Sequence, residues 1–152
     1  MYPKHHIILG AIFAAALYFI FPSIGILNAA IVFLSSFLID VDHYIYYRYK
    51  TGNWNLKKAY DWFEERGRKL DCLPRKKREE FYLAFCFLHG IEVLIILFIL
   101  SIFVSKHFLF IFTGVALHLI LDTLHQTTYQ DRIDKFSLIY DYLKFKKLKF
   151  AN

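Results

Sequence analysis

The sequence predicts an all-α fold, an integral membrane four-helix bundle with a cytoplasmic amphipathic helical loop. Of its 152 residues, 57% are hydrophobic and 20% are aromatic, far more than a soluble domain of this length needs for its core. In addition, residues 7–39 carry no charged side chain, and residues 81–105 carry only Glu92. Apolar runs of this length match a hydrocarbon core of about 30 Å. We therefore expect one membrane domain over residues 1–152.

The first apolar run predicts a helical hairpin with spans over about 6–21 and 27–47. A single helix over residues 7–39 would be about 50 Å long, and proline, serine, glycine and asparagine cluster within residues 22–28. A basic Lys4 before an apolar run also suits a signal peptide, but the run continues far beyond any cleavage point. We therefore expect the first span to remain as an anchor.

The second span can cross a bilayer only by continuing past Ile39. Residues 27–39 give about 20 Å of helix, which is shorter than the hydrocarbon core. The helix must therefore take Asp40, Asp42 and His43 below the headgroups, before the tyrosines that follow.

Two further spans are expected over about 81–104 and 108–124, joined by a short turn. Eleven Lys and Arg against six acids lie within residues 44–80, and six against three lie after residue 125. By the positive-inside rule, the cytoplasmic loop 48–80, the tail 125–152 and the N-terminus face the cytoplasm. This predicts a multi-pass protein of the cell (inner) membrane.

The cytoplasmic loop contains an amphipathic segment. Apolar residues recur there at helical spacing, with basic residues between them: Leu56, Ala59, Tyr60, Phe63 and Leu70. Such a helix can lie on anionic lipid or pack on the bundle as a cap, and both readings are compatible with the sequence.

Ionisable side chains recur within the expected spans. Each costs at least about 2.5 kcal/mol to insert at the centre of a span, so such residues usually have a partner. The sequence places no Lys or Arg inside the spans, and a divalent cation would neutralise the carboxylates instead. The candidate metal ligands are His6, Asp40, Asp42, His43, His89, His118, Asp122 and His125.

The expected topology brings these candidates to one depth, because each span reaches the cytoplasm at a known end. His118, Asp122 and His125 stand at i, i+4 and i+7, on one stripe of a helix, and His89 and Glu92 share a face in the same way. A mixed imidazole and carboxylate set suits a divalent metal, with Zn expected first and Mn or Fe as alternatives. The number of ligands allows one or two ions. Cys72 and Cys86 have no zinc-like spacing and carry no functional signal.

These motifs resemble the family of LexA-binding, inner-membrane-associated metal-dependent hydrolases. The resemblance rests on His6 with Gly10, on the run Leu38-Ile39-Asp40-Val41-Asp42-His43, and on His118 with Asp122. The third motif of the family is degraded. Only its second histidine is present, as His89, while Ala84 and Phe85 replace its first histidine and its arginine, and Gly90 follows where serine would be. The resemblance implies a metal-dependent hydrolase fold.

The leading functional hypothesis is a hydrolase of a lipid-borne ester or phosphoester at the cytoplasmic leaflet of the membrane. The metal would lower the pKa of a bound water, and Glu92 or Asp42 would act as the catalytic base. Arg48 or Arg75 would bind the substrate near the headgroups.

The same ligands are also compatible with a metal-ion carrier or store, with a membrane di-iron oxidase, or with a degenerate metal-binding protein that has lost turnover. The net charge of +6 is read as a topology signal, so no nucleic-acid partner is expected.

Overall fold

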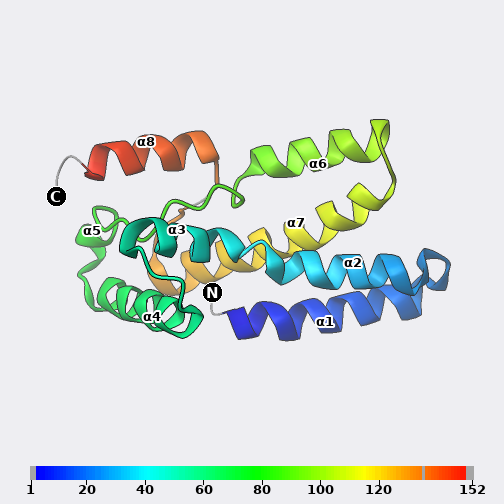
Figure 1. The fold of residues 1–152 in the computed structure, drawn as a ribbon, viewed down its shortest axis with the longest axis horizontal. Helices are drawn as coiled ribbons and strands as arrows, with labels where there is room; N and C mark the ends of the chain where they lie inside the picture. The colour runs from blue at the N-terminus through cyan, green and yellow to red at the C-terminus, as the bar shows by residue number, and fades with distance from the viewer. Residues whose placement is uncertain (1–2, 135, 150–152) are drawn as a thin grey trace.

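The computed structural model describes residues 3–134 and 136–149, and these residues form helices and connecting segments with no β-strand (Figure 1). The expected all-α class is therefore confirmed. Residues 150–152 of the predicted tail, together with residues 1–2 and 135, lie outside the described residues.

The first two helices form the predicted hairpin. Helix α1 (Pro3–Ile20) is followed by a short 3₁₀ turn, η1 (Pro22–Ile24), and by α2 (Gly25–Leu38). Gly25 has a positive φ of 73°, a conformation that favours glycine and reverses the chain here. The two helices lie antiparallel, side by side (Figure 1).

The second span is interrupted at the acidic residues. Helix α2 ends at Leu38 and α3 (Val41–Thr51) begins three residues later. At the break the Asp40 N–H donates to the carbonyl of Phe37 at 3.2 Å. Together with η1, the two helices are long and apolar enough, over Pro22–Thr51, to cross a membrane. The chain nevertheless passes through Asp40 as a turn, where we expected a continuous helix.

Helix α7 (His107–His125) packs against α2, α6 and α1, and continues into a π-helical turn, η2 (Gln126–Gln130). Two glycines allow the close approach. A Cβ at Gly114 would lie 2.4 Å from the Val32 carbonyl oxygen, and one at Gly10 of α1 would lie 2.0 Å from Ser36 Oγ. Such small residues let helix backbones pack closely. Helices α1 and α7 are thereby held tightly against α2.

The predicted helix over 81–104 is wrong in its first half. Residues 81–90 are not helical, and α6 spans only Ile91–Phe103. Backbone carbonyls outside a helix need other donors, and here two arginines supply them. Arg66 donates to the carbonyls of Tyr82 and Leu83, while Arg132 donates to that of Phe81 at 3.0 Å.

Within residues 3–134 and 136–149, three helices are long and apolar enough to cross a membrane, where four were expected: α1, the interrupted α2–α3 pair with η1, and α7 with its π-helical turn. With 13 residues, α6 is about 20 Å long, short of a hydrocarbon core of about 30 Å. It packs against α7.

The remaining helices gather at the end of the molecule opposite the hairpin turn (Figure 1). They are α4 (Leu56–Cys72), the short α5 (Arg75–Arg78) and α8 (Leu138–Lys149). Helix α4 is the amphipathic helix that the sequence predicted. Asn55 caps it by accepting from the Lys58 N–H, and its Ala59 and Leu70 are buried. This burial favours the reading of α4 as a cap packed on the protein.

Candidate metal centre

Five polar side chains from separate parts of the chain converge at the break between α2 and α3. His6 comes from α1, Asp40 from the break, His89 from the segment before α6, and His118 and Asp122 from α7. The three histidines and Asp122 are buried, and Asp40 is partly exposed. Side chains that lie far apart in the sequence are thus close together in the structure.

Two of the histidines are oriented by acceptors on their Nδ1 atoms. His118 Nδ1 lies 2.9 Å from the carbonyl oxygen of Ser36, and His89 Nδ1 lies 2.8 Å from Asp42 Oδ2. Both acceptors require a proton on Nδ1, so in the neutral rings both Nε2 atoms carry lone pairs. These two Nε2 atoms face each other at 3.0 Å. This tautomer is the one that metal-binding histidines adopt.

Two carboxylates complete this group of ligand atoms. Asp40 Oδ1 lies 3.4 Å from His89 Nε2 and 3.6 Å from His118 Nε2. Asp122 Oδ2 lies 4.0 Å and 3.7 Å from the same two nitrogens. In a tetrahedral zinc site, with metal–ligand distances of about 2.0–2.1 Å, the ligand atoms are about 3.3 Å apart. Asp40 and the two histidines therefore form one group whose ligand atoms could hold a divalent cation, and Asp122 forms a second such group with His118 and His6.

His6 contacts the other side of the same carboxylate. Its Nε2 lies 3.1 Å from Asp122 Oδ1, and its ring stacks on His118 with centroids 3.8 Å apart. Its Nδ1 and Asp40 Oδ2 are buried atoms without a hydrogen-bond partner among the described residues. Two polar atoms at this centre thus remain available to a ligand.

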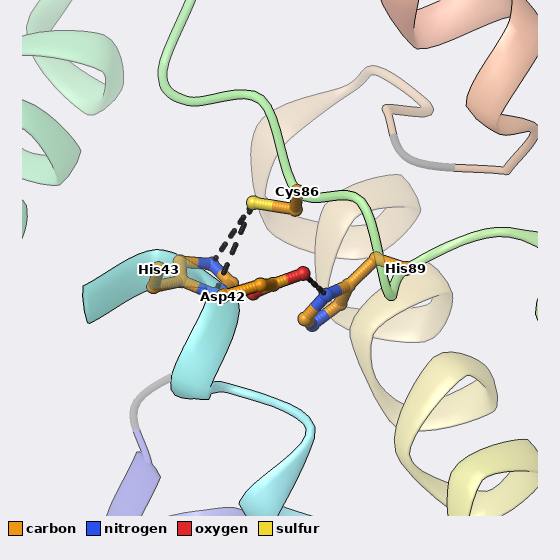
Figure 2. Close-up of side chains that lie close together, drawn as sticks. All are labelled: Asp42, His43, Cys86 and His89. Atoms are coloured by element: carbon orange, nitrogen blue, oxygen red, sulfur yellow. Dashed lines mark hydrogen bonds and ion pairs between the residues drawn. The ribbon is translucent and has the colours of Figure 1, made fainter. Parts of the chain in front are cut away.

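A second group of metal-ligating atoms adjoins the first: Asp42, His43, Cys86 and His89 (Figure 2). Asp42 Oδ1 lies 2.8 Å from His43 Nδ1, and Asp42 Oδ2 also accepts from the Leu88 N–H at 2.9 Å. The Cys86 sulfur lies 3.6 Å from His43 Nε2. Sequence reasoning assigned no role to Cys86, because it placed the residue inside an apolar helix.

Glu92 does not take part in this centre, contrary to the role of base considered from the sequence. Because α6 begins at Ile91, Glu92 lies in its first turn and His89 lies outside the helix, so the two do not share a helix face. Glu92 instead accepts from Ser137 Oγ at 2.6 Å and from the Leu138 N–H at 2.9 Å. It therefore caps the N-terminus of α8.

His125 lies outside the groups of metal-ligating atoms among the described residues. It follows His118 by seven residues, so it shares the face of α7 but lies about 10 Å further along the helix. Its ring packs against Tyr129 with centroids 5.2 Å apart. Like Asp122, His125 lines the cavity beside the centre, and its role as a metal ligand stays a prediction.

Neither arginine proposed for substrate binding lines the cavity beside the centre. The Arg48 guanidinium lies over the Trp54 ring, 4.8 Å from its centroid. Arg75 is exposed and pairs with Asp131, and this hydrogen bond lowers the pKa of the Asp131 carboxyl. Both arginines thus have other partners.

A cavity of about 400 Å³ opens onto the centre between α4 and α7. Asp40, His43 and Asp122 reach it from the metal-ligating side. Its opposite wall is largely the apolar face of α4, with Leu56, Ala59, Tyr60, Phe63 and Leu70. Further carboxylates line it at Glu64, Asp71 and Asp134, and no Lys or Arg of the described residues does so. The ligand atoms are therefore accessible from an apolar and acidic cavity.

The comparisons with known proteins add no relative. No family model matches the sequence, and the searches of curated proteins and of solved structures found no match.

Proposed function

We propose that this protein is a membrane-embedded, metal-dependent hydrolase of lipid-borne esters. The observation that supports this proposal most strongly is the pair of facing Nε2 atoms of His89 and His118 at 3.0 Å. Two lone pairs at this distance repel each other unless a cation lies between or beside them. Asp40 and Asp122 adjoin the same point and add negative charge there, which favours a divalent ion over a single proton.

The bound metal would be Zn²⁺ first, with Mn or Fe as alternatives, since imidazole and carboxylate ligands suit all three. Such an ion supplies a water whose pKa is lowered towards 7 and polarises a carbonyl oxygen. Among this chain's own residues, Asp40 is best placed to hold the proton of that water. It lines the cavity, and its Oδ2 has no hydrogen-bond partner among the described residues.

Asp42 is a positioning residue in this proposal, although the sequence also suggested it as a base. Its carboxylate is completely buried and engages His43, His89 and the Leu88 N–H. It therefore orients His89 so that the Nε2 atom points at the metal.

The cavity favours an uncharged ester over a phosphoester. Its wall on α4 is apolar and suits an acyl chain, while the carboxylates and the absence of Lys or Arg among its described lining residues would repel an anionic headgroup. The resemblance to inner-membrane hydrolases and the three helices of membrane-spanning character support action on a membrane lipid. We place the centre and both termini on the cytoplasmic side, as the charge distribution suggests.

A metal-ion carrier or store is the second candidate, because one observation favours it. The cavity leads to the centre past Glu64, Asp71 and Asp134, and such an acidic lining attracts cations. A carrier of this kind would bind metal at the same ligands and show uptake without hydrolysis.

Metal analysis and a lipid screen on the detergent-purified protein test both candidates. We expect bound divalent metal in the wild-type protein and a lower metal content in Asp40→Ala and His118→Ala. His107→Ala is the matched control, because His107 lies at the other end of α7, where its Nδ1 lies 2.8 Å from Asn28 Oδ1, and it should keep the metal.

Metal-dependent cleavage of uncharged lipid esters would support the hydrolase. Uptake into liposomes without turnover would support the carrier, and metal-free wild-type protein would contradict both.

A further inference from the structure

The most informative feature that the proposed hydrolysis leaves unused is the Cys86 side chain. Cys86 lies in the non-helical segment before α6 and is completely buried. Its sulfur points at the ring of His43, the first-turn residue of α3, and lies 3.6 Å from Nε2 and 3.9 Å from Nδ1 (Figure 2). A side chain from an irregular segment thus meets an imidazole that also reaches the cavity.

The surroundings of the sulfur differ on its two sides. On one side it joins a small apolar cluster with Tyr46 and Ala84, against which Phe63 and Trp62 pack. On the other side lie His43 and the buried carboxylate of Asp42. A cysteine that served only as a small apolar residue would not need two polar ligand groups on one side.

The position of the sulfur is fixed by the segment that carries it. Arg66 of α4 donates to the carbonyls of Tyr82 and Leu83, which holds the chain just before Cys86. Immediately after it, the Leu88 N–H and the His89 ring both donate to Asp42 Oδ2. The segment is thus tied to α4 on one side of Cys86 and to Asp42 on the other.

We propose that Cys86, His43 and Asp42 form a second metal site, in which the cysteine sulfur is a thiolate ligand. The three side chains belong to a group whose ligand atoms all lie within 4.8 Å of one another. His89 belongs to the same group, but its Nε2 faces the first centre, so its Nδ1 serves to hold Asp42. Of these three side chains only His43 lines the cavity, so an ion held by them would be reached from the cavity on the His43 side, and three protein ligands are the number found in catalytic zinc sites.

The two sites are physically linked and chemically different. Asp42 Oδ2 contacts His89, whose Nε2 belongs to the first centre, while Asp42 Oδ1 contacts His43 of the second. The first centre offers only nitrogen and oxygen atoms, whereas the second adds a soft sulfur. Soft thiolates favour Zn²⁺ and related ions over Mg²⁺ or Mn²⁺, so we expect the second site to retain zinc-like ions selectively.

Cobalt spectroscopy tests this inference without any substrate, so it can fail or succeed independently of the proposed hydrolysis. We expect the full-length protein in detergent to bind two equivalents of Co²⁺ and to show the near-ultraviolet charge-transfer band of a thiolate–cobalt bond. Cys86→Ser should remove the band and reduce binding to one equivalent. Cys72→Ser is the matched control, because Cys72 is exposed on α4, and it should keep both.

The Cys72→Ser variant also keeps the test decisive if Cys86→Ser does not fold. Cys86 is the only thiol left in Cys72→Ser, so a thiolate band in that protein assigns the sulfur without altering the site. His118→Ala should lose the first equivalent and keep the band. The inference is overturned if Cys72→Ser lacks the band, or if Cys86→Ser retains it.

Discussion

The metal-ligating atoms come from two regions of the molecule that are built in opposite ways. His6, His118 and Asp122 lie on regular helices, and glycines hold these helices tightly against α2. Cys86 and His89 lie in residues 81–90, which have no regular structure and depend on arginine side chains for their backbone hydrogen bonds.

The difference shows two ways of fixing a ligand. On the helical side, each histidine is separated by one turn from a glycine on the same face, His6 from Gly10 and His118 from Gly114. The close approach of the α1 and α7 backbones to α2 at these glycines therefore sets the position of each histidine. On the irregular side, the position depends on a few long side chains that reach across from α4 and from the segment after α7. We expect metal binding to be sensitive to added side-chain volume on α1 and α7, and to the loss of hydrogen bonds in residues 81–90.

The largest effect is expected from Gly114→Ala. The new Cβ would lie 2.4 Å from the Val32 carbonyl oxygen, a backbone atom that cannot move away without shifting α2. Overpacking of this kind costs about 1–3 kcal/mol or more, and it would draw His118 away from Ser36. We expect loss of bound metal and a clearly lower unfolding temperature in detergent.

Gly67→Ala is the control for this substitution, because it adds the same methyl group to a helix with no atom within 4 Å of the new Cβ. It should raise the free energy of unfolding by up to about 1 kcal/mol. Equal metal content in the two variants would refute the role of close helix packing.

A smaller effect is expected from Arg66→Met on the irregular side. The substitution keeps most of the aliphatic stem but leaves the carbonyls of Tyr82 and Leu83 without their donor. Unsatisfied buried groups cost about 1–3 kcal/mol, and the looser segment should weaken metal binding through His89 and Cys86. Titration with Co²⁺ should show a reduced affinity with unchanged stoichiometry.

Arg68→Met provides the comparison, since Arg68 is exposed and pairs only loosely with Glu64, at 3.4 Å. Its cobalt affinity should equal that of the wild type. If both arginine variants bind equally well, the segment is held by other contacts.

The smallest effect is expected from Glu92→Ala. Removing the cap of α8 should cost about 1 kcal/mol of stability and leave the metal content unchanged, because Glu92 contacts Ser137 and Leu138 and lies outside the groups of metal-ligating atoms. Thermal unfolding and metal analysis of the same sample measure both quantities. Loss of metal in Glu92→Ala would contradict this expectation and would indicate that Glu92 takes part in the metal centre.

The helical side of the site was predictable from the sequence because its signals are local. The break in the first apolar run, the need for a longer second span, and the i, i+4 spacing of His118 and Asp122 each follow from helix geometry. These three signals predict that Asp40, His118 and Asp122 lie at one depth.

The course of residues 81–90 was not predictable, because the side chains that hold this segment lie far from it in the sequence. Residues 81–90 carry no Asp, Glu, Lys or Arg, and only Gly90 indicates a boundary before the helix that follows. Their course depends on Arg66 and Arg132, neither of which carries a signal for that contact in the sequence. The sequence therefore predicted a helix at Cys86 and gave no indication that the residue contacts His43.

The interruption after Leu38 has a consequence for how this centre can change during evolution. Because the Asp40 N–H turns to Phe37, the carbonyl of Ser36 at the end of α2 remains free to accept from His118 Nδ1. The group that selects the histidine tautomer is thus a main-chain atom that no substitution at position 36 deletes. Replacing Ser36 with another small residue would keep this acceptor, so the tautomer of His118 does not depend on the side chain at position 36.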